Sequence, residues 1–471
     1  MFRRPTVRSL PDSVWTVAAA ATLAAGALTV RAVSDPSPWL HLKVGRFLVD
    51  GGRFGARDPW APFAQGHYEP TQWLPSVGTA LLYGWWGLPA VAWVRGAGII
   101  ALALALLLTL RSVARPSLTL LAAVLAVAGS WPALTERPQL AGFVLLVVTV
   151  GAWWRSAHDG RTRWWLVPLT WLAACVHGVW SIGLGIGLLV VVGLTLEHSF
   201  RRDQRTRMAL CLLASLAATA LTPLGPRLTA SPFAVGGNGR QFVSEWMASS
   251  ARAPSVALTL VVLALVLAVW FRLGERPSSW QLLVWVAAVG LTLVMQRTVP
   301  VGVILAAFLV AENAEHLLVA RGRLATPPGV RRVELLGLLA GALVGVVAAV
   351  PLAQVRAQHA LGVPTGLASS LSSLPDGTRV LSDGDMSGWV MFVAPKAQPV
   401  FDIRVEVYTP SRIRGFIDAT AAKPGWTSYL RQSGTRAALL KQDSPLVSAL
   451  GAQWHWRTVA RDDGYVLMAA S

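Results

Sequence analysis

The stretch Ser34-Asp35-Pro36-Ser37-Pro38-Trp39-Leu40-His41-Leu42-Lys43-Val44-Gly45-Arg46 decides how this chain is interpreted. It follows an apolar run at 14–33 and gathers a carboxylate, an imidazole, basic groups and a tryptophan just beyond a candidate membrane helix. Most other charges fall in short loops between apolar runs. A carboxylate at that depth can meet a lipid headgroup, so this segment indicates what kind of membrane protein the chain is.

The composition excludes a soluble domain. The chain has 471 residues, of which 54% are hydrophobic and 14% charged, with a mean hydropathy of +0.52. The formal charge of +18 would suggest nucleic acid in a soluble protein. Here the arginines sit between apolar runs, as the positive-inside rule describes, so no nucleic-acid partner is expected. Cys175 and Cys211 fall inside apolar runs, and we expect neither a disulfide nor a cysteine metal site.

The apolar runs predict a polytopic α-helical membrane protein with about 11 transmembrane helices. The first could pass for a secretory signal, but further spans follow, so we interpret it as a retained helix. The predicted spans are 14–33, 89–110, 116–133, 138–154, 164–176, 179–197, 208–222, 255–273, 278–294, 300–317 and 333–355.

The distribution of basic residues orients these spans. Arg3, Arg4 and Arg8 place the N-terminus in the cytoplasm, and alternation then puts about 18 basic residues in short cytoplasmic loops and about 9 in much longer outer loops. This topology depends on two choices. We interpret 71–87 as an interfacial helix because Pro75, three glycines and the Trp85-Trp86 pair interrupt its short apolar part. We interpret His177-Gly178 as a short hairpin between two spans.

The composition changes after Val355. Residues 356–471 carry polar turns, short alternating strands and intervening helices, which predicts a small extracytoplasmic α/β domain after a transmembrane domain at 1–355 whose first outer loop is 34–88. The expected strands are 378–381, 389–393, 399–403, 437–440, 457–460 and 465–469, and the expected helices are 410–421, 425–433 and 444–451.

Asp35 is the candidate catalytic residue. It lies within a few residues of the outer end of the first span, where Pro36 and Pro38 fix an extended turn. A carboxylate there can act as general base on an acceptor hydroxyl. The alternative is a structural one, in which Asp35 caps the helix that begins near Trp39 or lies in a solvated turn.

A second group of residues provides candidate binding groups. Arg95 lies inside a span, and Arg137 and Arg297 lie at outer helix junctions, against the positive-inside bias. Guanidiniums that converge at the outer leaflet suit a phosphate or diphosphate; the alternative is that each snorkels separately. His177 can be a ligand or a polar turn, and the polar side chains after Trp39 can form a solvated face. The candidate binding residues are His41, Lys43, Arg46, Asp58, Gln72, Trp73, Arg95, Arg137, His177 and Arg297.

The order of these motifs resembles the bacterial GT-C-like membrane glycosyltransferases, the superfamily that includes protein mannosyltransferases and lipid A aminoarabinose transferases. The C-terminal part is also similar to the extracytoplasmic α/β end of an uncharacterised group within it. The resemblance extends over nearly the whole chain. It rests on Asp35 to Gly45, Asp58-Pro59, Trp73-Leu74, Arg137-Pro138-Gln139-Leu140, His177-Gly178, Thr222 to Gly225 and Glu245-Trp246, and in the C-terminal part on 383–389, 400–404 and 441–446.

The resemblance implies a transferase that uses a polyprenyl-phosphate-linked sugar, with an acidic residue in a first outer loop flanked by two juxtamembrane helices. Asp35 matches the first carboxylate of the usual Asp-Pro-Asp, whereas Ser37 stands where the second is expected. Thr71-Gln72 replaces the usual His-Glu before Trp-Leu, and Cys175 replaces the usual asparagine before His-Gly. A chain with these departures can keep the fold without the activity.

We therefore expect sugar transfer to an envelope glycan, lipid or protein acceptor at the outer face of the bacterial plasma membrane. Asp35 would be the base, and Arg95, Arg137 and Arg297 would neutralise the phosphate. The alternative is a non-catalytic scaffold or lipid-binding protein of envelope assembly. A transporter is third, since no inverted repeat is visible and Glu312 and Glu315 are the nearest acidic candidates in a span. We expect no cofactor and no metal, because one carboxylate makes a poor metal site.

Overall fold

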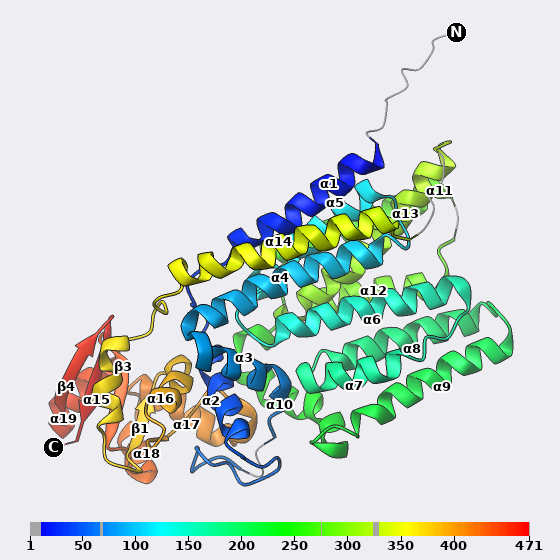
Figure 1. Ribbon diagram of the computed structural model, residues 1–471. Coiled ribbons are helices and arrows are strands. Elements are labelled where there is room, and N and C mark those ends of the chain that lie inside the picture. The colour runs from blue at the N-terminus through cyan, green and yellow to red at the C-terminus, as the bar shows by residue number, and fades with distance from the viewer. Residues whose placement is uncertain (1–10, 66–68, 275, 324–328, 471) are drawn as a thin grey trace.

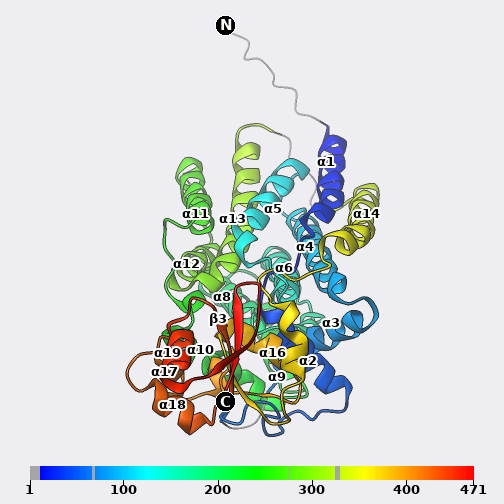
Figure 2. The same cartoon turned by 90° about the vertical axis from the view of Figure 1, so that its left-hand side faces the viewer.

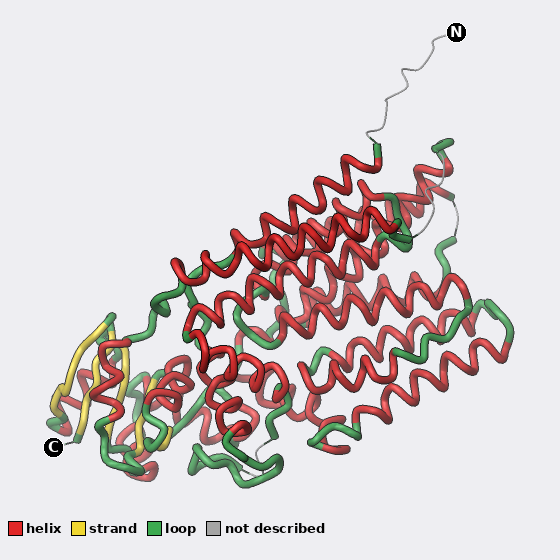
Figure 3. Tube along the Cα trace, in the orientation of Figure 1, coloured by secondary structure: helices red, strands yellow, loops and turns green. Residues whose placement is uncertain are grey.

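The structure, a computed structural model, describes residues 11–65, 69–274, 276–323 and 329–470. A long bundle of helices carries a smaller part with a β-sheet at one end, and the first helix begins at the other end (Figure 1). Figure 3 shows that strands occur only at the sheet end of the described chain. Arg3, Arg4 and Arg8, on which the cytoplasmic assignment of the N-terminus depends, lie outside the described residues.

Each predicted span range contains a helix, and a short break separates α7 from α8 at His177-Gly178, as expected. The helices are α1 (Asp12–Ala25), α4 (Leu88–Leu110), α5 (Pro116–Ser130), α6 (Gln139–Asp159), α7 (Leu166–Val176), α8 (Trp180–Leu196), α9 (Arg202–Thr219), α11 (Pro254–Leu273), α12 (Ser279–Val294), α13 (Val299–Ala320) and α14 (Arg332–Arg356).

Six segments in the described chain are long and apolar enough to cross a membrane, by length and composition. They are Leu88–Leu110, Pro116–Ala133, Gln139–Asp159, Pro254–Leu273, Gln296–Ala320 and Arg332–Arg356. The remaining apolar helices are shorter; α7, for example, has 11 residues and would rise only about 17 Å. The fold is that of a multi-pass membrane protein, while the exact number of spans stays a prediction.

Helix α13 forms the centre of the bundle. Every residue from Val299 to Leu309 is buried, so this helix is apolar on all sides, as a central helix must be. It packs against α5, α11 and α12. Its two carboxylates are bound inside the bundle: Glu312 accepts from Trp154, His158 and Gln281, and Glu315 pairs with Arg115. These contacts give both acidic groups a structural partner.

The loops that carry the basic residues meet at the end of the bundle away from the sheet (Figure 1). Gly329 N donates to Arg111 O at 2.8 Å, and Arg111 pairs with Glu334 at 2.6 Å. Ser279 N donates to Glu197 in the neighbouring pair of loops. The clustering agrees with the charge bias of the sequence, and the orientation of the bundle in a membrane stays a prediction.

Two helices lie in the segment between α1 and α4, where two juxtamembrane helices were expected. They are α2 (Ser37–Val49) and α3 (Trp73–Trp86). At 14 residues, α3 is about 21 Å long, too short to cross a hydrocarbon core. The two helices cross closely at Gly45, where a Cβ would lie 2.1 Å from Ser76 O.

The C-terminal part contains a five-stranded sheet with the order β2-β1-β3-β5-β4. Strands β2 (Gln398–Pro399), β1 (Arg379–Ser382) and β3 (Ala437–Lys441) are parallel, whereas β5 (Tyr465–Ala469) is antiparallel to β3 and to β4 (Arg457–Asp462). Side chains of β3 alternate between two hydrophobic clusters, so both faces are covered. The helices are α15 (Ala368–Ser372), α16 (Ser387–Val393), α17 (Pro410–Thr420), α18 (Trp426–Ser433) and α19 (Pro445–Trp454).

Two of the expected strands are wrong. Trp389–Val393 belongs to α16, and the strand expected at 399–403 is reduced to the short β2. Trp389, Val390 and Met391 are all buried, because α16 packs between the sheet and α2. A short run that is apolar on every side has no period of two, so its sequence cannot separate a buried strand from a buried helix.

The C-terminal part is packed onto the bundle. One hydrophobic cluster contains Trp39 and Leu42 of α2 together with Trp389 of α16 and Leu439 of β3. Figure 2, turned by a quarter, shows α16 beside α2 below the bundle. The division at residue 356 therefore stays a prediction about chain organisation, whereas the packing itself is continuous.

Candidate functional site

A cavity of about 630 Å³ lies where the bundle meets the C-terminal part. Its walls come from the start of α2, residues 69–72 before α3, the start of α6, the segment 242–246 after α10 (Ser231–Phe242), Arg297, and residues 401–406. We call it the central cavity. Its size suits a small-molecule or headgroup ligand.

A chain of alternating charges runs along one wall of the central cavity. Arg137 Nε donates to Asp35 Oδ2 at 2.7 Å, and Arg137 Nη1 donates to the two oxygens of Glu245 at 2.7 and 2.9 Å. Arg297 lies 3.8 Å from Glu245 and stacks over the Trp246 ring, with 5.6 Å to the centroid. Arg137 is thus held by two carboxylates, whereas Arg297 has a looser contact with one of them.

Asp35 lies directly behind this wall. Its side chain is 4% exposed, and its Oδ1 accepts from Ser37 N at 2.8 Å. Asp35 is not the N-cap of α2, because that position is Pro36 and the helix has no side-chain cap. Burial acts to raise the pKa of this carboxyl, but the positive charge of Arg137 and the Ser37 hydrogen bonds outweigh it and lower the pKa below its usual value. Asp35 is therefore ionised at neutral pH and only weakly basic.

Two histidines line the cavity in their neutral form. His41 Nδ1 lies 3.1 Å from Ser76 Oγ, and burial, assisted by the charges of Arg137 and Arg297, lowers its pKa to about 4. His177 Nδ1 accepts from Val179 N at 3.2 Å, which leaves its proton on Nε2. Burial lowers the pKa of His177 well below its ordinary value. Both imidazoles can exchange hydrogen bonds with a ligand without adding charge.

The C-terminal part supplies the opposite wall. Arg404 pairs with Asp402 at 2.7 Å and, across the cavity edge, with Asp58 at 2.7 Å. Tyr408 Oη also donates to Asp402 at 2.8 Å. Glu406 is accessible to water within the cavity, but enclosure by the surrounding protein raises its pKa. The cavity is therefore lined by a carboxyl group, Glu406, whose pKa is shifted in the opposite direction to that of Asp35.

The structure brings together about half of the candidate binding residues. His41, Gln72, Arg137, His177 and Arg297 line the central cavity. Asp35 touches it through Ser37 and Arg137, and Asp58 through Arg404.

Four candidates lie elsewhere. Lys43 lies over Trp60, Arg46 stacks on Phe392 at 4.2 Å, and Trp73 packs edge-on against Phe54. Lys43 and Arg46 point away from the cavity because α2 turns by about 100° per residue, which separates them from the cavity-facing His41. They are therefore packing groups at the rim of the fold.

Arg95 is also separate from the cavity. Its Nε donates to Leu134 O at 2.7 Å, its Nη1 to Thr29 O, and Glu136 lies 3.7 Å away. It lines another pocket on the outside of the bundle. The turn that contains Glu136 and Arg137 divides the two places, so the three arginines do not converge as a single group.

Sequence reasoning did not assign a role to Glu245, Arg404 or Glu406. Glu245-Trp246 and the stretch around Arg404 were visible as parts of the resemblance, but nothing in the sequence showed that they face Arg137. Glu406 carries no local signal. Among the described residues no group of three or more His, Cys, Asp or Glu side chains has the arrangement of a metal site, and the expectation about metals stays a prediction.

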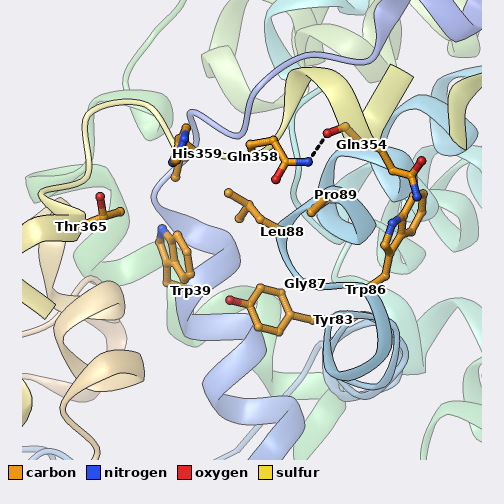
Figure 4. Close-up of a pocket in the computed structure, with 11 residues that line it drawn as sticks. Trp39, Tyr83, Trp86, Gly87, Leu88, Pro89, Gln354, Gln358, His359 and Thr365 are labelled. Atoms are coloured by element: carbon orange, nitrogen blue, oxygen red, sulfur yellow. Dashed lines mark hydrogen bonds between the residues drawn. The ribbon is translucent and has the colours of Figure 1, made fainter. Parts of the chain in front are cut away.

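A second cavity, of about 600 Å³, lies on the other side of α2. Trp39, Tyr83 and Trp86 surround it together with Gln354 and Gln358 at the end of α14 and the start of the following loop (Figure 4). The buried Trp39 Nε1 has no hydrogen-bond partner among the described residues. Helix α2 thus presents Trp39 to this cavity and His41 to the central one.

The sequence matches no family model and no curated protein, but the fold matches solved structures. The oligosaccharyltransferase AglB from Archaeoglobus fulgidus, in complex with an inhibitory peptide and a dolichol-phosphate, superposes with a TM-score of 0.60 at 11% identity, over 91% of this chain and 69% of that one. ArnT from Cupriavidus metallidurans, bound to undecaprenyl phosphate, superposes with a TM-score of 0.55 at 16% identity, over 97% of each chain. The chain therefore has the fold of the GT-C-like membrane glycosyltransferases, which confirms the resemblance seen in its sequence at the level of the fold.

Proposed function

We propose that this protein is a membrane glycosyltransferase that moves a sugar from a polyprenyl-phosphate-linked donor to an envelope acceptor at the outer face of the bacterial plasma membrane. The observation that carries the proposal is the central cavity, which Arg137, Arg297 and Glu406 line and behind which Asp35 binds Arg137. The fold adds support, because AglB and ArnT have been solved with dolichol-phosphate and undecaprenyl phosphate.

Arg297 is the cation best placed to receive the donor phosphate. Arg137 already makes short, charge-assisted hydrogen bonds to two carboxylates, whereas the one ion pair of Arg297 with Glu245 is 3.8 Å long. A phosphate can therefore compete for Arg297 more easily than for Arg137. As the bond between the sugar carbon and the phosphate oxygen breaks, the guanidinium would stabilise the charge that develops on the leaving phosphate.

A carboxylate must take the acceptor proton while the acceptor oxygen forms its bond to the sugar carbon. Asp35 is the candidate from the sequence, but its lowered pKa and its two partners make it a weak base. Glu406 has a raised pKa and reaches water in the cavity. General bases work best when their pKa approaches the working pH, so the direction of the two pKa shifts and the place of Glu406 in the cavity lining favour Glu406 as the base and Asp35 as the group that holds Arg137.

The test is a transfer assay on the purified full chain with a panel of polyprenyl-phosphate-linked sugars, in which released polyprenyl phosphate is measured by mass spectrometry. Turnover should fall by about 10²-fold or more in Glu406→Gln if Glu406 is the base, and in Asp35→Asn if Asp35 is. The control is Asp376→Asn, an exposed carboxylate that pairs with Lys396. Full activity in both test variants would exclude Glu406 and Asp35 as the base and would overturn the mechanism.

A non-catalytic scaffold or lipid-binding protein is the second candidate. It is favoured by Ser37, which stands at the position of an expected carboxylate, and by the contacts that hold Asp35 in place. Such a protein would bind polyprenyl phosphate in the central cavity and release none from any donor of the panel. Binding that is lost in Arg297→Gln, together with absent turnover in the unmodified chain, would decide for the scaffold.

The orientation follows from the same proposal. The C-terminal part, whose residues help to line the cavity, lies at one end of the bundle, and the basic loops lie at the other (Figure 1). With those loops in the cytoplasm, the cavity and residues 356–471 face the outside. Cysteine labelling with a membrane-impermeant reagent at Ser448 and at Ser279 checks this, because only the first should react in intact cells.

A further inference from the structure

A pocket on the outside of the bundle gathers three arginines next to an apolar surface. Residues 28–32, Arg95, Trp131 and Arg356 enclose about 560 Å³. We call it the arginine pocket. It lies on the other side of the Leu134–Pro138 turn from the central cavity and shares no lining residue with it.

Two of the three guanidiniums are fixed by the backbone. Arg95 donates to Leu134 O and Thr29 O, and Arg356 Nη1 donates to Leu28 O and Val30 O at 3.1 and 3.0 Å. A guanidinium carries five N–H donors, so each keeps donors for another acceptor. Arg31 is 48% exposed and pairs loosely with Glu136 at 3.6 Å. The donors are thus preorganised around the pocket.

The charge of the pocket is positive in either protonation state of Glu136, because one carboxylate faces three arginines. The Glu136 side chain is fully buried, and neither of its oxygens has a hydrogen-bond partner among the described residues. A single carboxylate at salt-bridge distances of 3.6 and 3.7 Å neutralises the group only in part. An additional anion would complete it.

The surroundings of the pocket indicate where that anion comes from. Helices α1 and α14 pack together at the edge of the bundle (Figure 2). They expose large apolar side chains along their length: Val17, Leu336, Leu343, Val347 and Val355 are 59–78% exposed. Such a face belongs against lipid tails, and Val355 directly precedes Arg356. The arginines therefore lie at the level where the apolar face ends, which is where lipid headgroups lie.

We propose that the arginine pocket binds the phosphate of an anionic glycerophospholipid from the outer leaflet, with the acyl chains along α1 and α14. The phosphodiester accepts hydrogen bonds from Arg31, Arg95 and Arg356, and Trp131, which is 48% exposed beside Arg95, sits at the interface. This site goes beyond the proposed transferase function and does not depend on it.

Native mass spectrometry of the purified full chain in detergent tests the site, with phosphatidylglycerol and phosphatidylcholine of the same acyl chains as probes. The chain should bind the anionic lipid preferentially, and Arg31→Gln/Arg356→Gln should weaken that binding by about tenfold or more, given about fivefold for each basic residue at a membrane surface. Arg31→Gln alone should cost about fivefold. This single variant guards against misfolding, because Arg31 makes no backbone contact that anchors α14.

The matched control is Arg53→Gln/Arg252→Gln, which removes two exposed arginines at the same end of the bundle. It should keep the preference for phosphatidylglycerol. Equal binding of the two lipids by the unmodified chain, or an equal loss in the control, would overturn the site. A loss of undecaprenyl phosphate binding with phosphatidylglycerol binding intact would also overturn it, because the pocket would then serve the donor lipid.

Discussion

Arg137 connects the residues that matter at the central cavity. It joins Asp35 from the first outer loop to Glu245 from the segment after α10, and both bonds are 2.7 Å long. Breaking a buried ion pair leaves its partner charge uncompensated. Loss of Arg137 would therefore expose two carboxylates to each other and disturb the cavity wall, whereas Arg297 can be altered with less structural damage.

Arg297→Gln should weaken the use of the lipid-linked sugar donor and leave the stability of the fold nearly unchanged. The variant loses a guanidinium whose nearest carboxylate is 3.8 Å away, so the thermal midpoint should change little. Removal of one donor to a developing oxyanion costs about 10²–10³-fold in rate, and we expect a loss of kcat/KM for the lipid-linked sugar in that range. Arg252→Gln is the matched control. Unchanged kinetics in Arg297→Gln would remove this residue from the phosphate site.

The two histidines of the central cavity predict a loss of stability in acid. His41 has a folded pKa of about 4, chiefly because of burial, against an ordinary 6.5. Between these values the unfolded chain binds a proton that the folded chain does not, so stability is complete above pH 6.5 and falls as the pH drops. His177 acts in the same direction.

Thermal melts across this pH range, in detergent, measure the effect. The midpoint should fall with the pH in the unmodified chain, and His41→Gln should flatten the dependence. His359→Gln, an exposed histidine, should not change it. A midpoint that rises on acidification would contradict the assignment of a neutral, buried His41.

Several cavity residues could be predicted one at a time. Arg137 and Arg297 were predicted to be binding residues because an arginine at an outer helix junction opposes the positive-inside bias. Lys43 and Arg46 lie apart from them in space, because the direction of each side chain depends on the rotational phase of α2 and on the aromatic rings that receive it. Charge and position in the chain indicate that a residue is unusual, whereas its neighbours are a property of the fold.

Helix α2 is the element that serves two cavities. Ser37, Leu40, His41 and Val44 line the central cavity, and Trp39 lines the second one. Its position depends on the close crossing with α3 at Gly45, where His41 also reaches Ser76. The distance between α2 and α3 therefore determines the position of the His41 imidazole in the central cavity.

Gly45→Ala should destabilise this crossing. The added Cβ would lie 2.1 Å from Ser76 O and 2.6 Å from Ala80 Cβ, and the backbone carbonyl cannot move aside alone. Overpacking of this kind costs about 1–3 kcal/mol, and we expect the upper part of that range in thermal melts.

Gly78→Ala is the matched control on the same helix pair. A Cβ there meets nothing within 4 Å, so the change should be neutral or stabilise α3 by up to about 1 kcal/mol through helix propensity. If Gly45→Ala and the unmodified chain have equal melting midpoints, α2 and α3 can move apart without a cost in free energy.

Element types followed from the sequence wherever a run was long or strictly alternating. The apolar ranges of the bundle all contain helices, and β3 and β5 lie within a residue of their expected bounds. The strand expected at 399–403 is only the short β2, and the strand expected at 389–393 is α16, whose apolar residues are buried on all sides between α2 and the sheet. Tertiary packing decided its conformation, and nothing local in the sequence records that packing.

At the scale of the whole molecule, an ion pair joins the segment between α1 and α4 to the C-terminal part. Arg404 binds Asp58 and Asp402 with its side chain only 6% exposed. Asn238 of α10 donates to the carbonyls of Val405 and Tyr408 on the same segment. These contacts hold residues 401–406 against the bundle and so complete the wall of the central cavity.

Asp58→Asn should weaken the contact between this segment and the C-terminal part. The amide keeps an oxygen for the backbone donors of Trp60 and Ala61 but loses the ion pair with Arg404. Because Arg404 retains Asp402, we expect a cost of about 2 kcal/mol, as for one charged hydrogen bond. Faster proteolysis between α14 and α15 and a lower melting midpoint would report it.

Asp376→Asn provides the comparison, since the Asp376–Lys396 pair is 3.1 Å long but about 70% exposed on both sides. An exposed pair contributes little, so the free energy of unfolding should stay within about 0.5 kcal/mol of that of the unmodified chain, and the midpoint should barely move. If Asp58→Asn is as stable and as protease-resistant as this control, the C-terminal part is held by apolar packing alone.

The sequence predicted an outer α/β part but not that it completes the cavity. Asp58 and Arg404 are 346 residues apart, and neither stands in a pattern that points to the other. Glu406 and Arg297 line the same cavity only because α14 returns the chain to the end of the bundle that carries the sheet. Contacts of this range arise from the packing of whole elements, which a single sequence does not record.

The turn from Leu134 to Pro138 connects the arginine pocket to the central cavity. Successive residues point in opposite directions there: Glu136 toward Arg31 and Arg95 outside, and Arg137 toward Asp35 and Glu245 inside. One peptide unit links the two side chains, so a rotation of that unit displaces both at once. A lipid phosphate that competes with Glu136 for Arg31 would therefore change the charge beside the peptide unit that also carries Arg137.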